Sequence, residues 1–216
     1  RTLRHNLPGF QSNVLGVIHE CSLHVRLIIT PILTALHRCY KNCYRFIDRG
    51  IASMIGSSAD WKLTTTAYAH QRAAIEKLSQ LKVGALFMDM GTGKTRTALE
   101  LIWLRRKRIV KCVWCCPVSL MEETRREILR HTSCIDTDIH MVGPRTREEN
   151  IPQAMWYLVG LESLGRSPRV AYVLDRLIDG GTFLVVDEST YIKGHRAKRT
   201  RRLIGFGTRA PYRLIL

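Results

Sequence analysis

The sequence predicts an α/β fold of three layers, in which helices cover both faces of a mainly parallel sheet, preceded by a small helical segment. Three observations predict it. Short apolar runs alternate with helical patterns from residue 61 onward. These runs are continuously apolar, as in strands that are buried on both faces. The chain has 216 residues, enough for one such core and a small additional element.

Residues 1–60 differ from the rest of the chain. Over residues 31–47, apolar side chains recur at helical spacing and basic residues lie mostly on the opposite side. We interpret this pattern as a helix that packs on the main core, in preference to a helix lying on a membrane. Residues 56–60 have the composition of a short linker. The boundary is therefore predicted at residue 60, with the main domain over residues 61–216.

The elements of the main domain follow from local patterns. Helices are expected between the strands. Ser119 and Glu122 predict a capping box before a helix at Met121–Leu129, and Ser167 followed by Pro168 predicts the start of another helix. The predicted strands are Ala85–Met88, Ile109–Cys116, Asp138–Val142, Trp156–Gly160, Thr182–Val186 and Tyr212–Leu216.

The net charge is strongly positive. Lysine and arginine number 34 against 18 acidic residues, which gives a formal net charge of +16 and a pI of about 10.0. Such an excess favours a polyanionic partner such as nucleic acid, and an anionic membrane surface would be attracted by the same charge. A basic surface that only keeps the protein soluble is the alternative. The longest apolar run, Leu27–Leu36, is too short to span a bilayer.

The seven cysteines form no regular framework. Their number is odd, and no secretory signal opens the sequence. We therefore expect free thiols in a reducing compartment, the cytoplasm. Cys112 and Cys115 have the spacing of half a zinc site, but they lie in a predicted buried strand. We interpret them as core residues and expect no structural metal.

Asp89–Thr95 has the pattern of a phosphate-binding loop. It lies between an apolar run and a helical pattern, and its glycines allow backbone N–H groups to turn toward phosphates at a helix N-terminus. The Lys94 side chain would reach the β- and γ-phosphates of a nucleotide, and the Thr95 hydroxyl would bind Mg²⁺. The residues predicted to bind the nucleotide here are Met90, Gly91, Thr92, Gly93, Lys94 and Thr95.

A pair of acids ends another predicted strand. Thr182–Val186 is followed directly by Asp187 and Glu188, at the edge where open parallel sheets bind ligands. Asp187 is placed to hold Mg²⁺, and Glu188 to orient or deprotonate an attacking water. A helix N-cap is the alternative for an isolated Asp-Glu pair. The distance in sequence from Lys94 leaves room for several βα units between the two segments.

Further segments complete an ordered set of motifs. They are Tyr68–Ile75 before the phosphate loop, Cys116–Met121 and Leu161–Leu164 between the loop and the acids, and Val186–Lys193. With the phosphate loop, this set resembles helicase superfamily two, and within it the Swi/Snf-type translocases, especially their phage and prophage relatives. The resemblance covers residues 64–216. It implies a RecA-like P-loop NTPase domain that uses ATP and Mg²⁺.

The resemblance also implies roles for individual residues. Gln71 would hydrogen-bond adenine, while Lys94 and Glu188 would be catalytic. The residues implied to contact nucleic acid are Pro117, Ser119, Glu162, Ser163 and Lys193. A second RecA-like lobe, carrying an arginine finger, would follow the C-terminus in cis, and the protein would act inside a bacterial or phage-infected cell. The sequence departs from the family at Thr190, where many relatives have His, and at Gly194-His195, where Asn-Pro is common.

Basic residues gather in two further clusters. Each could contact phosphates or form a solvated helix face, and part of the first could face a partner lobe. The first cluster comprises Lys193, Arg196, Lys198, Arg199, Arg201, Arg202, Arg209 and Arg213. The second comprises Arg105, Arg106, Lys107, Arg108 and Lys111.

The function that the sequence predicts is the ATP-binding lobe of an ATP hydrolase, a helicase or translocase that couples hydrolysis to movement on DNA. Two alternatives stay open. One is another P-loop phosphotransferase, and the other is a non-catalytic nucleic-acid-binding module. The sequence also leaves open whether the substrate is duplex DNA, single-stranded DNA or RNA.

Overall fold

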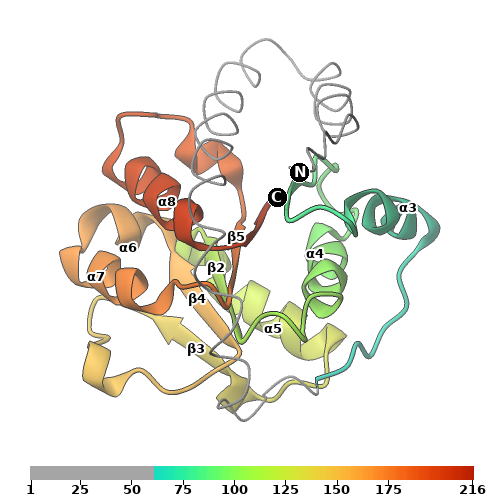
Figure 1. Cartoon of the computed structure of the whole chain (residues 1–216), viewed down its shortest axis with the longest axis horizontal. Coiled ribbons are helices and arrows are strands. Elements are labelled where there is room, and N and C mark those ends of the chain that lie inside the picture. The colour runs from blue at the N-terminus through green and yellow to red at the C-terminus, as the bar shows by residue number, and fades with distance from the viewer. Residues whose placement is uncertain (1–60) are drawn as a thin grey trace, which may run out of the picture. The chain divides into compact units, whose positions relative to one another are not determined.

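A computed structural model of the chain describes residues 61–216 (Figure 1). The predicted helical segment within residues 1–60 lies outside the described residues, so the boundary at residue 60 stays a prediction. In the described part, six parallel strands form one sheet in the order β1-β6-β5-β2-β4-β3. The strands are β1 (Val83–Ala85), β2 (Lys111–Cys116), β3 (Ile139–Val142), β4 (Trp156–Gly160), β5 (Thr182–Val186) and β6 (Tyr212–Ile215).

Helices cover both faces of this sheet, which confirms the predicted three-layer α/β fold. One face packs against α3 (Ala69–Leu78), α4 (Lys94–Trp103) and α5 (Met121–His131). The other face packs against three more helices, seen together in Figure 1. These are α6 (Leu161–Arg166), α7 (Pro168–Leu177) and α8 (Lys198–Arg209).

Alternate residues of each central strand pack into the two cores on opposite faces of the sheet. In β2, Trp114 packs with the α3–α5 layer and Val113 with the α6–α8 layer, and both are fully buried. Every residue of β4 and β5 is buried. This burial on both faces explains why Trp156–Gly160 and Thr182–Val186 could be delimited correctly from their apolar character alone.

The first predicted strand is displaced in the structure. We predicted Ala85–Met88, whereas β1 covers Val83–Ala85. Leu86 still donates its N–H to the Ile215 carbonyl at 2.8 Å, but the next residues leave the sheet, and Phe87 is 54% exposed. Because β1 is an edge strand with β6 as its single neighbour, an apolar run there is not required to stay in the ladder.

The predicted capping box before α5 is wrong. Residues 118–120 form a short 3₁₀ turn, and α5 begins at Met121 without a side-chain cap. Glu122 pairs with Arg125 instead, at 2.8 Å. The Ser167 cap is confirmed, because its hydroxyl accepts the Val170 N–H and Pro168 is the first residue of α7.

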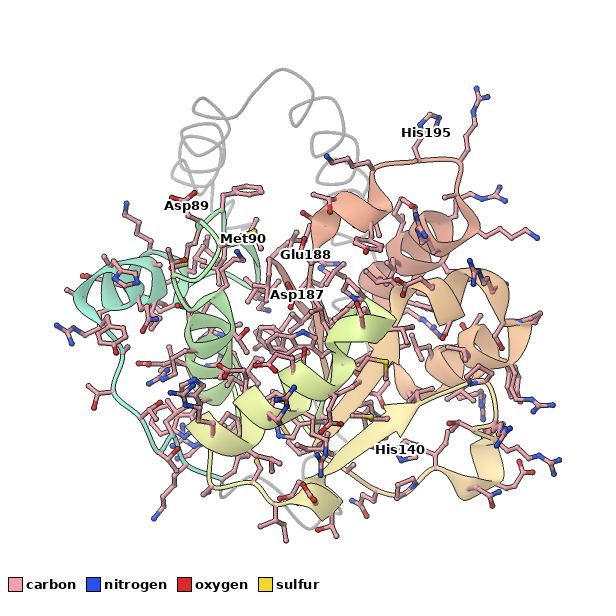
Figure 2. All side chains as sticks on the ribbon, turned by 180° about the vertical axis from the view of Figure 1, so that it is seen from behind. Asp89, Met90, His140, Asp187, Glu188 and His195 are labelled. Carbon is pink, nitrogen blue, oxygen red and sulfur yellow. The ribbon has the colours of Figure 1, made fainter. Side chains whose placement is uncertain are left out.

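A half-buried histidine on the edge strand β3 makes stability depend on pH. The Nε2 atom of His140 is buried without a hydrogen-bond partner among the described residues, and burial lowers the pKa of its imidazole (Figure 2). A depressed histidine pKa means that the unfolded chain binds the proton more tightly than the folded domain does. Stability is therefore lost as the pH falls below about 6.5, the ordinary histidine value.

We predict that His140→Phe makes the free energy of unfolding less dependent on pH between 7.5 and 5.5. Urea unfolding of the 216-residue chain at several pH values measures this. His195→Gln, which changes an exposed histidine, should leave the pH dependence of the wild type unchanged. An identical loss of stability at low pH in wild type and His140→Phe would contradict the prediction.

Candidate nucleotide site and nucleic-acid interface

The predicted site segments meet at one edge of the sheet. Because all six described strands run parallel, the turns after β1, β2, β4 and β5 emerge at their shared carboxyl edge. Figure 2 shows Asp89 and Met90 of the phosphate loop near Asp187 and Glu188. The ammonium of Lys94 is close enough to lower the pKa of Asp187. The phosphate loop and the two acids thus lie at the same edge of the sheet.

The phosphate loop depends on two glycines with left-handed backbones. Gly91 has φ 77° and Gly93 has φ 79°, values that other residues rarely adopt. Met90 at the tip is 88% exposed. The Thr92 hydroxyl donates to the Asp89 carbonyl at 2.7 Å, which closes the loop on itself.

Gln71 braces this loop from the start of α3. Its side chain is 3% exposed; its Oε1 accepts the Tyr68 N–H at 2.9 Å, and its Nε2 donates to the Thr92 carbonyl at 3.0 Å. A Cβ at Gly93 would lie 2.3 Å from that Nε2. His70, exposed on the helix surface, also reaches the Thr92 carbonyl with its ring, at 3.0 Å. The structure therefore gives Gln71 a contact with the loop, while its contact with adenine stays a prediction.

Lys94 and Thr95 begin α4 directly after the loop. The ammonium of Lys94 donates to the Met88 carbonyl at 3.0 Å and to the Asp89 carbonyl at 3.3 Å, so it is held at the inside of the loop. The Thr95 hydroxyl makes no hydrogen bond within residues 61–216 and is free to take a ligand.

Asp187 lies half-buried at the end of β5, where its N–H still donates to the Cys115 carbonyl at 2.8 Å. Burial raises the pKa of its carboxyl, and the neighbouring Glu188 charge raises it further. Three groups oppose the rise: the Glu188 backbone N–H, the Trp114 indole and Lys94. A bound metal ion would favour the ionised carboxylate and so offset the effect of burial.

Glu188 has a strained backbone. Its φ of 52° and ψ of 60° are left-handed, and among residues 61–216 it is the sole residue other than glycine with positive φ. Such a conformation costs of the order of 1 kcal/mol or more and is typical of functional sites. The strain turns the chain away from the sheet toward the 3₁₀ turn Ser189–Ile192.

The turn after β2 is fixed from β4 and α6. The Val118 N–H donates to the Glu162 carboxylate at 2.9 Å. A Cβ at Gly160 would lie 2.3 Å from the Val118 side chain, so glycine is needed there. Pro117 is buried, whereas Ser119 is exposed and Ser163 half-buried. Glu162 therefore positions this turn, and its predicted contact with nucleic acid stays untested.

Sequence reasoning missed Gly160. A glycine that ends a fully apolar strand is a signal of close backbone approach, and it could have indicated this crowded turn.

Some side chains of the first basic cluster contact other residues of the domain, and others are exposed without an acidic partner. Arg202 donates to the Leu164 carbonyl, Arg209 pairs with Asp175 at 2.8 Å, and Arg213 donates to the Gly207 carbonyl. Arg199 lies over the Tyr191 ring at 5.9 Å. The members that are exposed and have no acidic partner within residues 61–216 are Lys193, Arg196, Lys198 and Arg201. We call these four the free basic surface; Figure 2 shows cationic side chains projecting around His195.

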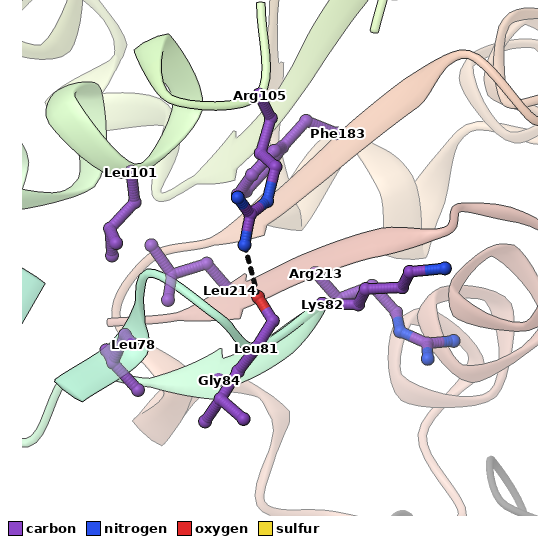
Figure 3. Close-up of a pocket in the computed structure, with 9 residues that line it drawn as sticks. All are labelled: Leu78, Leu81, Lys82, Gly84, Leu101, Arg105, Phe183, Arg213 and Leu214. Atoms are coloured by element: carbon purple, nitrogen blue, oxygen red, sulfur yellow. Dashed lines mark hydrogen bonds between the residues drawn. The ribbon is translucent and has the colours of Figure 1, made fainter. Parts of the chain in front are cut away.

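The second cluster lies at the opposite edge of the sheet, before β2, and is largely engaged. Arg105 donates to the Leu81 carbonyl at 3.4 Å beside a small cavity of about 10 Å³, room for a single water (Figure 3). Arg106 lies over the Trp103 ring at 3.9 Å, and Lys111 pairs with Asp179 at 2.8 Å. Lys107 and Arg108 are exposed.

The described cysteines are core residues, as predicted. Cys112 and Cys115 are fully buried and belong to the cores on opposite faces of the sheet, so they do not form half a zinc site. Within residues 61–216, no group of three or more His, Cys, Asp or Glu side chains is arranged around a common metal position. No helix of the same residues has the length and apolarity needed to cross a membrane.

The residues at the carboxyl edge fit a magnesium nucleotide. The left-handed glycines leave the loop backbone free of side chains, and a helix N-terminus follows it. Lys94 would hold phosphate oxygens, while Thr95 and Asp187 offer the hydroxyl and carboxylate oxygens that Mg²⁺ prefers.

We predict that Gly93→Ala impairs nucleotide binding and stability more than Gly91→Ala does. Both variants strain a left-handed backbone, which costs about 1–2 kcal/mol. Nothing lies within 4 Å of a Cβ at Gly91, however, whereas Gly93→Ala must also displace Gln71. Urea unfolding and binding of a fluorescent ATP analogue measure both effects. Adding Gln71→Ala to Gly93→Ala should restore stability toward that of Gly91→Ala, and equal effects of the two single variants would refute the explanation.

Comparison with solved structures shows the same fold. The SWI2/SNF2 ATPase core of Sulfolobus solfataricus in complex with dsDNA matches with a TM-score of 0.55 and 16% identity, over 71% of this chain and 32% of that one. The UvsW helicase of bacteriophage T4 matches with a TM-score of 0.53 and 13% identity, over 70% of this chain and 52% of that one. The Hef helicase domain of Pyrococcus furiosus gives a TM-score of 0.53 and 15% identity, over 68% and 31%.

The sequence comparisons identify the family. Curated protein sequences give no significant match. The family model of the SNF2-related domain matches residues 27–216, so the family match begins upstream of the boundary that we predict at residue 60. With the motifs in order along a RecA-like parallel sheet, the chain belongs to the SNF2-related domain family.

Proposed function

We propose that this chain contains the ATP-binding lobe of an ATPase that couples hydrolysis to movement on DNA. One observation carries the proposal: Lys94 after the phosphate loop and the acid pair Asp187–Glu188 (the acid motif), distant in sequence, lie at the same carboxyl edge of the sheet. Membership of the SNF2-related domain family supports it.

Each residue of the site has a role in this proposal. Lys94 neutralises charge on the phosphates, and Thr95 and Asp187 hold the metal. Bound Mg²⁺ supplies further neutralisation of the phosphate charge. Glu188 aligns a water for in-line attack and accepts its proton. The left-handed backbone of Glu188 supports this role, because such conformations are typical of functional sites.

We also propose that a second RecA-like lobe in cis completes the enzyme. The chain spans about a third of the length of the Sulfolobus SWI2/SNF2 ATPase core that it matches, which leaves room for such a lobe. An arginine finger from that lobe would raise the rate by about three to five orders of magnitude. On this basis the 216-residue chain alone should hydrolyse ATP slowly.

DNA is the proposed partner, and the free basic surface is its proposed contact together with the turn after β2. The Sulfolobus core was solved with dsDNA bound, which supports duplex DNA as the first ligand to test. Exposed cations without acidic partners are the groups that gain most from phosphates, because they give up no ion pair when they bind.

We predict that Glu188→Gln lowers the hydrolysis rate about 10²- to 10⁴-fold while nucleotide affinity is retained, since only the proton acceptor is removed. Lys94→Ala should lose affinity as well, because it removes the phosphate contact. Steady-state ATPase and equilibrium nucleotide binding measure the two variants. Glu149→Gln, which changes an exposed acid before β4, should match the wild type.

The same assays discriminate the alternatives. Phosphoryl transfer to an acceptor molecule, indifferent to DNA, would identify another P-loop phosphotransferase. Tight DNA binding without ATP affinity, unchanged by Lys94→Ala and Glu188→Gln, would identify a non-catalytic binding module.

We predict that replacing Lys193, Arg196, Lys198 and Arg201 by Gln weakens duplex DNA binding and flattens its salt dependence. For each phosphate that these side chains neutralise in the wild type, the slope of log K against log salt should become shallower by about 0.9. Fluorescence anisotropy with a labelled duplex at low and at near-physiological salt measures this. The paired control, Lys107→Gln with Arg108→Gln, removes exposed cations from the opposite sheet edge and should change the slope little. An equal effect per cation removed in the two sets would show nonspecific attraction by net charge.

A further inference from the structure

Trp114 lies on the strand next to the one that ends in the acid motif, and its indole nitrogen lacks a hydrogen-bond partner among the described residues. Its side chain is fully buried in the middle of β2. The indole nitrogen Nε1 makes no hydrogen bond with any of the described residues. Buried polar groups nearly always have a partner, so this N–H is a donor that the loaded site could use.

The strand register places this N–H beside Asp187. Trp114 pairs with Val185 of β5, and both belong to the core under α4. Asp187 comes two residues after Val185, so it faces the same side of the sheet. Diagonal neighbours of this kind lie roughly 7–8 Å apart, within reach of a large aromatic side chain. The indole also lowers the pKa of the Asp187 carboxyl, in agreement with this placement.

The carboxylate of Asp187 has room for a second internal donor. Its Oδ1 atom accepts the Glu188 N–H at 2.8 Å. An ionised carboxylate offers about four acceptor positions, so a further N–H leaves positions for a metal. Partners behind a ligating carboxylate fix its orientation and commonly change metal affinity about 10- to 100-fold.

We propose that the Trp114 indole N–H donates a hydrogen bond to the Asp187 carboxylate in the magnesium-nucleotide complex and so positions this carboxylate for the metal. The inference rests on the proposed function, since it deepens the role given there to Asp187. Trp114 is a positioning residue, because it acts through Asp187 and not on the nucleotide.

The test compares Trp114→Phe with Trp156→Phe in the 216-residue chain. Both tryptophans are fully buried in the core under α4, and β4 neighbours β2, but the Trp156 N–H already bonds the Cys134 sulfur at 3.2 Å. Phenylalanine keeps an aromatic ring and removes the N–H. Binding of a fluorescent ATP analogue is titrated with Mg²⁺ and repeated in EDTA.

Trp114→Phe should raise the Mg²⁺ concentration at half-maximal binding about 10-fold or more and leave affinity in EDTA unchanged. Trp156→Phe should alter neither quantity. If the two variants show the same Mg²⁺ dependence, the positioning role of Trp114 is wrong.

A second measurement uses the wild-type side chain and does not depend on the folding of Trp114→Phe. The chain has four tryptophans, whose indole ¹⁵N–¹H resonances can be assigned from Trp61→Phe, Trp103→Phe and Trp156→Phe. The Trp114 resonance should shift more than the others when Mg²⁺ and nucleotide are added, and Asp187→Asn should abolish that shift. A Trp114 resonance that stays fixed in both comparisons would overturn the proposal.

Failure of the proposed function has a different signature. A wild-type chain that binds no nucleotide at any Mg²⁺ concentration would refute the proposed ATP site. Where the wild-type chain does bind Mg²⁺ and nucleotide, a Trp114 resonance that stays fixed would refute the contact alone.

Discussion

The site depends on the position of β6 between β1 and β5. The last strand in sequence is the spacer that separates the phosphate loop from the acids. It holds both by backbone hydrogen bonds: the Leu86 N–H donates to the Ile215 carbonyl at 2.8 Å, and the Ser189 N–H donates to the Leu216 carbonyl at 3.3 Å. Two strand spacings put β1 and β5 roughly 10 Å apart, a gap that a triphosphate with its metal can bridge. The geometry of Lys94 and Asp187 is therefore set by residues at the far end of the sequence.

Strained backbone conformations and close contacts are concentrated at the carboxyl edge of the described sheet. Gly93 is in contact with Gln71, Gly160 is in contact with Val118, and Glu188 has a left-handed backbone without being a glycine. Each of these features restricts which residue the position accepts, and each lies at the end of a strand or in the segment that follows it. Departures from ideal local geometry are expected where function requires a particular placement. Their concentration here is independent support for the carboxyl edge as the working surface.

Much of the fold and of the nucleotide site could be predicted, because strong local patterns coincided with burial. β4 and β5 are apolar throughout and buried on both faces, so their limits were correct. The phosphate loop was found because glycine, lysine and threonine occur at a fixed spacing. β1 was misplaced because an edge strand can release apolar residues such as Phe87 to the surface. The capping box failed because Ser119 lies in a 3₁₀ turn whose shape is imposed from Gly160 and Glu162, far away in sequence. The contact of Gln71 with the loop is likewise long-range.

Hydrogen bonds at α8 and α6 link the segment after the acid motif to the turn after β2. The 3₁₀ turn that follows Glu188 ends at Ile192, whose carbonyl accepts the Thr200 hydroxyl of α8 at 3.2 Å. Two residues further along α8, Arg202 donates to the Leu164 carbonyl of α6. At the start of α6, Glu162 accepts the Val118 N–H.

Because packed helices move as units, a displacement of the turn after Glu188 would be transmitted to α8 and α6, and so to both proposed DNA contacts. The free basic surface lies on α8 and on the segment that leads into it, so it would move with the acid motif. The second basic cluster lies at the opposite edge, where Arg105 bonds a carbonyl and Arg106 lies over a ring. Position, and not charge alone, distinguishes the cluster that we propose to contact DNA from the second cluster.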